Sequence, residues 1–174
     1  ALNGGTINDG GGNAATLTLA APGATGSISD DKAIVIDTVG PAVTNVTSTL
    51  ADGTYPTGTK VDIDITFDEA VTVTGTPQLT LETGTTDQVA GYLSGTGTTT
   101  LTFRYVVMTG DTSADLDYVA TTSLGLNGGT MNDAAGNAAT LTLPAPGAAG
   151  SLGANKALVI DGTNPGVINV SSTT

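Results

Sequence analysis

The chain has 174 residues, with 16 acidic against four basic side chains and a formal net charge of −12. So acidic a chain lacks the Lys and Arg needed to neutralise phosphates, which argues against nucleic-acid binding. It contains no His and no Cys, which excludes disulfides and zinc sites built from those ligands, and no apolar run long enough to insert into a membrane.

The amino-acid sequence at the beginning of the chain is repeated near its end. DGGGNAATLTL at residues 9–19 returns as DAAGNAATLTL at 133–143, and KAIVID at 32–37 returns as KALVID at 156–161. The spacing is 124 residues without a gap, as from Asp37 to Asp161, which indicates tandem copies of one module. We therefore predict residues 1–39 as the C-terminal part of a preceding repeat, 40–161 as a complete repeat, and 162–174 as the first strand of the following repeat.

Alternating apolar and polar residues, typical of half-buried strands, recur along the complete repeat. In KVDIDITF, residues 60–67, Val61, Ile63, Ile65 and Phe67 face one side and the aspartates the other. Strands are predicted at 43–48, 60–67, 71–73, 78–81, 89–93, 98–107, 118–126, 138–143 and 157–160, with turn residues between them. This spacing of short antiparallel strands predicts an all-β, immunoglobulin-like β-sandwich.

Acidic residues concentrate in the predicted loops and linkers. Because strands of a sandwich alternate in direction, these segments sort to two poles, one at the incoming and one at the outgoing linker. The first pole gathers Asp37, Asp68, Glu69, Asp133 and Asn137, and the opposite pole gathers Asp111, Asp115, Asp117 and Asp161. Such carboxylates repel unless a cation joins them, and Ca²⁺ takes six to eight oxygen ligands. We therefore predict calcium at the junctions between repeats.

Each acidic motif also has a plainer interpretation. Asx residues are ordinary turn formers, so NDAAGN at 132–137, taken alone, favours a hairpin loop without metal. The run GDTSADLDY at 110–118 fits a ligand loop and a solvated turn equally well. Asp62 and Asp64 are expected simply on the wet face of a strand. The convergence of several loops and a linker on two interfaces is what favours calcium.

Three stretches together carry a family resemblance: VIDTVGP at 35–41, FDEAVTVTGTPQLTLETG at 67–84 and NDAAGNAATLTLPAPG at 132–147. In their order and spacing they resemble the immunoglobulin-like, cadherin-like tandem repeats of giant bacterial surface adhesins. The resemblance covers the whole chain and implies a secreted, cell-surface extender that holds a terminal binding domain away from the cell. It also implies Ca²⁺ at the domain junctions, with ligands Asp37, Glu69, Asp133 and Asn137 at one and Asp111, Asp115, Asp117 and Asp161 at the other. The linker lacks the fuller acidic run of cadherins, so fewer ions per junction are expected.

Three other classes of function stay open. Residues 1–36 offer strands that would complete a neighbouring identical chain, as in a self-assembling extracellular filament. A carbohydrate-binding module would need exposed aromatics, for which only Tyr55 is placed suitably. An enzyme would have to use carboxylates such as Asp68 and Glu69, and no apolar pocket is implied that would separate their pKa values. We expect no catalysis and no small-molecule substrate, with neighbouring repeats or identical chains as partners.

Overall fold

Two units make up the chain in the computed structural model, residues 1–37 and residues 38–174. The structure describes residues 3–166, 170 and 171. We call residues 1–37 the N-terminal segment and residues 38–161, which hold all of the described strands, the β module. The first strand predicted for the next repeat, within 162–174, falls largely on residues 167–169 and 172–174, which lie outside the described ones.

Strands dominate the regular structure. They are β1 (Val43–Ser48), β2 (Gly53–Pro56), β3 (Lys60–Thr74), β4 (Gln78–Leu81), β5 (Gln88–Ser94), β6 (Thr98–Val106), β7 (Thr112–Ser113), β8 (Leu124–Gly125), β9 (Thr130–Asn132) and β10 (Leu158–Asp161). Two single-turn helices, α1 (Ile28–Asp31) and α2 (Leu152–Asn155), occupy corresponding places in the two sequence copies. Each begins at a serine, Ser27 or Ser151, whose hydroxyl accepts a backbone N–H of the first turn.

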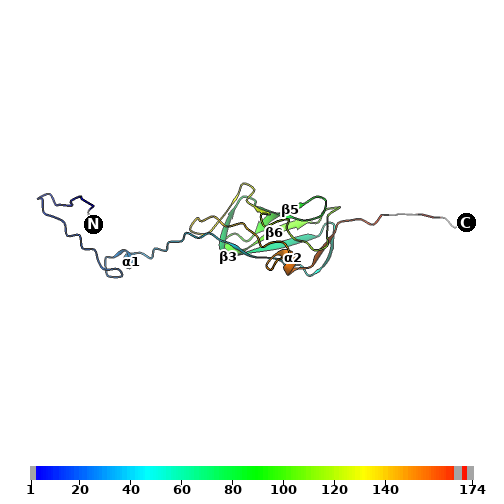
Figure 1. The fold of residues 1–174 in the computed structure, drawn as a ribbon, viewed down its shortest axis with the longest axis horizontal. Coiled ribbons are helices and arrows are strands. Elements are labelled where there is room, and N and C mark those ends of the chain that lie inside the picture. The colour runs from blue at the N-terminus through cyan, green and yellow to red at the C-terminus, as the bar shows by residue number, and fades with distance from the viewer. Residues whose placement is uncertain (1–2, 167–169, 172–174) are drawn as a thin grey trace. The chain divides into compact units, whose positions relative to one another are not determined.

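The larger of two sheets has the strand order β1-β3-β6-β5-β4-β8, with β9 also paired to β3. Figure 1 shows β3, β6 and β5 side by side in this sheet, whose pairs are all antiparallel. In the smaller sheet β10 lies between β2, to which it is parallel, and β7, to which it is antiparallel. The prediction of an all-β, mainly antiparallel fold is confirmed.

Strand β3 shows how the alternating sequence directs folding. Val61, Ile63 and Ile65 are fully buried. On the other face Asp62 lies opposite Arg104 of β6, whose Nε and Nη2 each donate to the carboxylate at 2.6 Å. The hydrogen bond from Arg104 is the largest influence on Asp62 and lowers its pKa. One face therefore supplies the core and the other a cross-strand ion pair.

Some predicted strand boundaries differ from the structure. β3 continues through a register irregularity between residues 66 and 71, so the strands predicted at 60–67 and 71–73 are one strand. The stretches 118–126 and 138–143 contain only β8 and isolated bridges, although Tyr118 and Leu143 are buried. In addition, β2, β7 and β9 form where the pattern predicts no strand. Alternation reports which side chains are buried, and a buried side chain does not require a continuous ladder.

Both sheets contribute to one hydrophobic core. Its buried members include Val46, Ile63, Ile65, Leu79, Leu81, Leu101, Phe103 and Tyr105 from the larger sheet and Leu158 and Ile160 from the smaller. Tyr92 is partly buried and packs edge-on against Phe103, with ring centroids 5.8 Å apart. Removal of this apolar surface from water is the main stabilising contribution, and it fixes the loops that carry the acidic residues.

Candidate metal centre

The loop at residues 133–137 closes on itself through one carboxylate. Asp133 Oδ1 accepts from the backbone N–H of Asn137 at 2.7 Å, and Oδ2 accepts from the Asn137 side-chain amide at 2.7 Å. The copy in the N-terminal segment makes the same turn, because Asp9 accepts from the backbone and side-chain N–H groups of Asn13, both at 2.9 Å. The sequence D-x-x-G-N therefore forms this turn from local interactions, in agreement with the plainer interpretation.

These hydrogen bonds favour the ionised form of both carboxylates. The side-chain hydrogen bond from Asn13 is the largest of the causes that lower the pKa of Asp9 below 3.8. At Asp133 burial acts to raise the pKa, but the hydrogen bonds from Asn137 and the neighbouring backbone N–H groups together outweigh it and lower the pKa. Asp133 is only 6% exposed, so the module holds a nearly buried negative charge at neutral pH.

Asp68 and Glu69 lie within β3, between the buried Phe67 and Val71, and not at the end of a strand as predicted; they differ in role. The Asp68 backbone N–H donates to the Ala42 carbonyl at 3.0 Å, and its Oδ1 accepts from the Ala42 N–H at 2.7 Å. Asp68, which was predicted as a ligand, therefore binds the entering chain at Ala42 to β3. Glu69 is half-buried and belongs to a different group of side chains.

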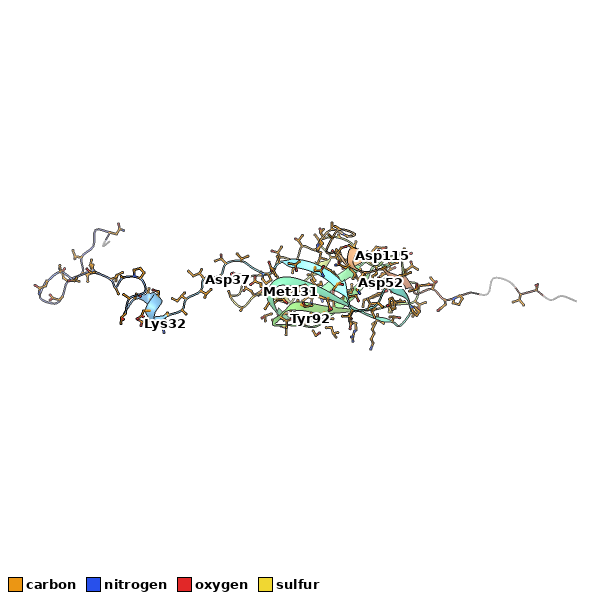
Figure 2. The ribbon with its side chains drawn as sticks, turned by 90° about the horizontal axis from the view of Figure 1, so that it is seen from below. Lys32, Asp37, Asp52, Tyr92, Asp115 and Met131 are labelled. Atoms are coloured by element: carbon orange, nitrogen blue, oxygen red, sulfur yellow. The ribbon has the colours of Figure 1, made fainter. Side chains whose placement is uncertain are left out.

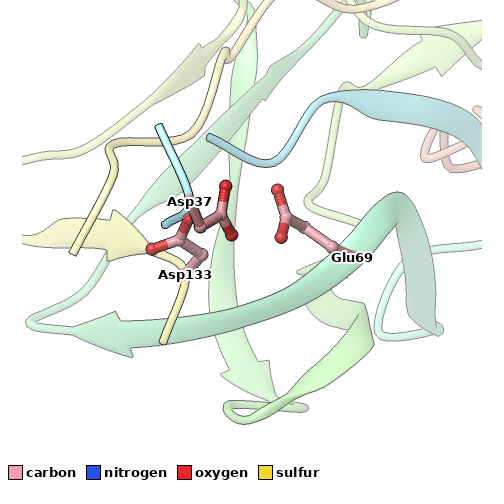
Figure 3. A group of neighbouring side chains, drawn as sticks. All are labelled: Asp37, Glu69 and Asp133. Carbon is pink, nitrogen blue, oxygen red and sulfur yellow. The ribbon is translucent and has the colours of Figure 1, made fainter. Parts of the chain in front are cut away.

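Three carboxylates form that group: Asp37, Glu69 and Asp133 each offer an oxygen, and these atoms all lie within 4.8 Å of one another (Figure 3). Asp37 is exposed and is one peptide bond from Thr38, the first residue of the β module, while Glu69 lies on strand β3 and Asp133 in the loop at 133–137. Anionic oxygens at this spacing repel, and a hard divalent cation between them offsets the repulsion. The donor set fits Ca²⁺, which prefers carboxylate oxygens and tolerates irregular geometry.

Asp111, predicted as a ligand at the opposite pole, is a buried hydrogen-bond acceptor in the structure. It is 4% exposed. Its Oδ2 accepts from the Tyr105 hydroxyl at 2.6 Å and the Met108 N–H at 2.8 Å, and its Oδ1 accepts from Gln88 Nε2 at 3.0 Å. Burial, followed by the hydrogen bond to Asp111, raises the pKa of Tyr105. This carboxylate ties the loop after β6 to β5 and β6.

Asp117 and Asp161 also have partners within the fold. Asp117 Oδ1 accepts from the Tyr118 N–H at 2.9 Å, and Oδ2 accepts from the Gly147 N–H at 3.0 Å. Asp161 Oδ1 accepts from both the backbone N–H and the hydroxyl of Thr163, and the hydroxyl is the largest cause of its lowered pKa. Asp161 therefore stabilises a local turn, whereas Asp117 fastens the chain beside Tyr118 to the distant loop at Gly147.

Asp115 is exposed and, like Asp52, lies towards the end of the β module away from Met131 (Figure 2). Within the described part of the chain, Asp37, Glu69 and Asp133 are the acids that converge as a group of three or more, and none of the four acids predicted for the opposite pole joins a group of this kind. A second calcium ion at that pole stays a prediction, and it would have to compete with the hydrogen bonds already made there.

The sequence analysis did not predict the contacts of two residues beside the acidic group. The Val39 carbonyl accepts from Asn137 Nδ2 at 3.3 Å, which fastens the linker to the 133–137 loop. Gly40 permits the approach, since a Cβ there would lie 2.0 Å from the Ala138 carbonyl oxygen. A glycine before a proline in the linker is the only sequence signal for this contact, and glycine has many other uses.

In the described residues neither helix has the length and apolar character to cross a membrane. Comparison with protein-family models, curated proteins and solved structures found no match for this chain.

Proposed function

We propose that the chain is a structural, non-catalytic repeat of an extended extracellular protein, of the kind found in bacterial surface adhesins. In this proposal the β module is an immunoglobulin-like sandwich whose partners are further copies of itself along one polypeptide. The observation that carries the proposal is the copied sequence at a spacing of 124 residues, from Asp37 to Asp161. Two sheets that share one core support it, because such a module can fold as an independent unit of an array.

We place a calcium ion among Asp37, Glu69 and Asp133. Asp37 ends one copy of the repeat, while Glu69 and Asp133 belong to the next copy. By the same spacing, Asp161 stands to a following copy as Asp37 stands to the β module. One ion at each junction would then stiffen the array by linking an aspartate near the end of one repeat to strand β3 and the 133–137 loop of the next.

Thermal unfolding with saturating calcium and with excess EGTA tests the cation. An ion at a hundred times its Kd stabilises the folded state by about 2.7 kcal/mol, which corresponds to a rise in Tm of roughly 10 °C for a module of this size. Glu69→Gln keeps the shape of the side chain and removes its charge, so it should abolish most of that rise. Asp87→Asn, a change at an exposed acid outside the group, is the matched control and should keep it.

If Tm were the same with calcium and with EGTA, the repeat would bind no stabilising calcium ion and would be a plain spacer. A rise in Tm that Glu69→Gln does not reduce would place the ion elsewhere, with Asp115 the first residue to replace. Direct calorimetric titration of calcium into both variants separates a change in binding from a change in stability.

The second candidate is a filament subunit completed by strand exchange between identical chains. Exposed apolar side chains of the N-terminal segment favour it, among them Leu19, Ile28, Val35 and Ile36, which are 74 to 88% exposed. Such a surface calls for a covering partner. Light scattering separates the two candidates, since exchange between identical chains predicts oligomers that grow with concentration.

A further inference from the structure

The N-terminal segment exposes apolar side chains that its copy in the β module buries. Leu19, Ile28, Ile34 and Ile36 line an open hollow of about 540 Å³ and are 65 to 88% exposed. Their counterparts, listed in the same order, are Leu143, Leu152, Leu158 and Ile160, each at most 2% exposed. In the module these counterparts are covered by residues 38–124, which we call the body. The surface that fits the N-terminal segment is therefore the body of a module of this type.

Two differences between the copies conflict with the body of this chain. Ser29 stands where the module has Gly153, and a Cβ at Gly153 would lie 2.9 Å from Asp117 Oδ2 and 3.5 Å from Asp117 Cβ. Thr38, the residue after the segment, corresponds to Gly162, the residue after the module. A Cβ at Gly162 would lie 2.3 Å from the Met108 carbonyl oxygen and 2.9 Å from that of Asp111, and no side-chain rotation relieves a clash with backbone.

Ser29 also takes over the role of the group with which it conflicts. In the module the N–H of Gly147 donates to Asp117 Oδ2 at 3.0 Å. In the N-terminal segment the corresponding N–H, of Gly23, donates to Ser29 Oγ at 2.8 Å. In the segment, the acceptor for this backbone N–H is therefore a serine of the segment itself. In the module, the acceptor for the corresponding N–H is a carboxylate of the body.

The charge of the segment favours the same conclusion. Asp30 and Asp31 stand where the module has Ala154 and Asn155, so a body with an aspartate beside this turn would face two further negative charges. In the module, Asn155 Nδ2 donates to the Val46 carbonyl at 2.8 Å, which an aspartate cannot do. Ser29 and Asp31, with Thr38 directly after the segment, thus correspond to residues that contact the body in the module, whereas Ala154, the counterpart of Asp30, is exposed.

We propose that the N-terminal segment closes the body of a different repeat, one with no carboxylate at the place of Asp117 and with room for a side chain opposite the Met108 carbonyl. It follows that the segment does not exchange with residues 125–161 of an identical chain. The inference rests on the tandem repeats of the proposed function and is independent of calcium, so the two can fail separately.

Thermal unfolding of full-length variants tests the mismatch. Gly162→Thr introduces the side chain of Thr38, the residue directly after the segment, against backbone and should lower Tm by about 10 °C. Gly153→Ser and Asp117→Ala should each lower Tm, but Asp117→Ala/Gly153→Ser should be more stable than the sum of the two losses predicts, because Ser Oγ then accepts from Gly147. The control, Leu152→Ile/Leu158→Ile, introduces apolar residues of the segment and should shift Tm by no more than about 3 °C.

Several results would overturn the proposal. An unchanged Tm for Gly162→Thr or Gly153→Ser would mean that the segment fits this body. If the Tm loss of Asp117→Ala/Gly153→Ser equalled the sum of the two single losses, Ser29 would not replace the Asp117 carboxylate as acceptor. If the control lowered Tm as much as Gly162→Thr does, the mismatch would lie in the core residues and not at Gly162. Light scattering of the unmodified chain should detect monomers up to high concentration, and a stable oligomer held by exchanged segments would also contradict it.

Discussion

Replacing Asp111 by alanine removes the acceptor of three hydrogen bonds at once. The Tyr105 hydroxyl, the Met108 N–H and the Gln88 amide all donate to this carboxylate, at 2.6 to 3.0 Å. A hydrogen bond to a charged group contributes about 1.5–3 kcal/mol, and a buried donor left unpaired costs a similar amount. The Tyr105 contact is buried and the other two are partly buried, so water replaces part of the latter. We therefore expect a loss of about 3–5 kcal/mol in the free energy of unfolding.

Urea unfolding with calcium and with EGTA measures this loss. Because all three partners are protein donors, the loss should be the same in both conditions. Asp115→Ala, which removes a nearby exposed acid, is the control and should change stability by no more than about 0.5 kcal/mol. A loss under about 1 kcal/mol at Asp111 would refute the hydrogen-bond reasoning. A loss that appears only with calcium would return Asp111 to the role of metal ligand.

Gly40→Ala should destabilise the module by roughly 1–3 kcal/mol, because the new Cβ would lie 2.0 Å from the Ala138 carbonyl oxygen; urea unfolding measures this, and no change would mean that the linker moves aside. The pKa of Asp133 is lowered from 3.8, so its contribution to stability is present above that value and is lost as the pH falls through the lower folded pKa. Asp133→Asn should accordingly flatten the fall of Tm in acid, and an unchanged slope would contradict this. Burial raises the pKa of both Tyr105 and Tyr118 above 10, so the stability that they contribute is complete below pH 10 and is lost as the pH rises further. Ultraviolet absorbance should show these two tyrosines ionising only as the chain unfolds in alkali, whereas ionisation before unfolding would refute their burial.

The sequence pattern predicts a strand correctly where a segment with buried side chains also has its backbone paired in a sheet. In β3, β4 and β6 every buried side chain lies on a paired strand, so alternation locates both. Around Tyr118 and Leu143 the side chains are buried while the backbone makes only isolated contacts. Sequence alternation does not distinguish these two cases, because it reflects the environment of the side chains alone.

For the acidic site, strand direction was the useful guide. It predicted that Asp37, Glu69 and Asp133 would share one end, and the structure brings their oxygens within 4.8 Å. The same reasoning did not foresee that Asp111 would be buried against Tyr105, since that contact depends on how the loop after β6 folds back over the sheet. An aspartate in a loop has the same sequence signature whether it faces solvent, a metal or a buried hydroxyl.

The two copies of the repeat separate local from tertiary causes within one chain. The Asp–Asn turn and the serine cap of the single-turn helix are present in both copies. Because the Asn of the same five residues donates to the aspartate in both copies, the turn forms from local hydrogen bonds and is by itself no argument for calcium. The argument for calcium depends on Glu69, which lies outside the turn, and for that reason Glu69→Gln is a more decisive test of the metal centre than any change within the turn.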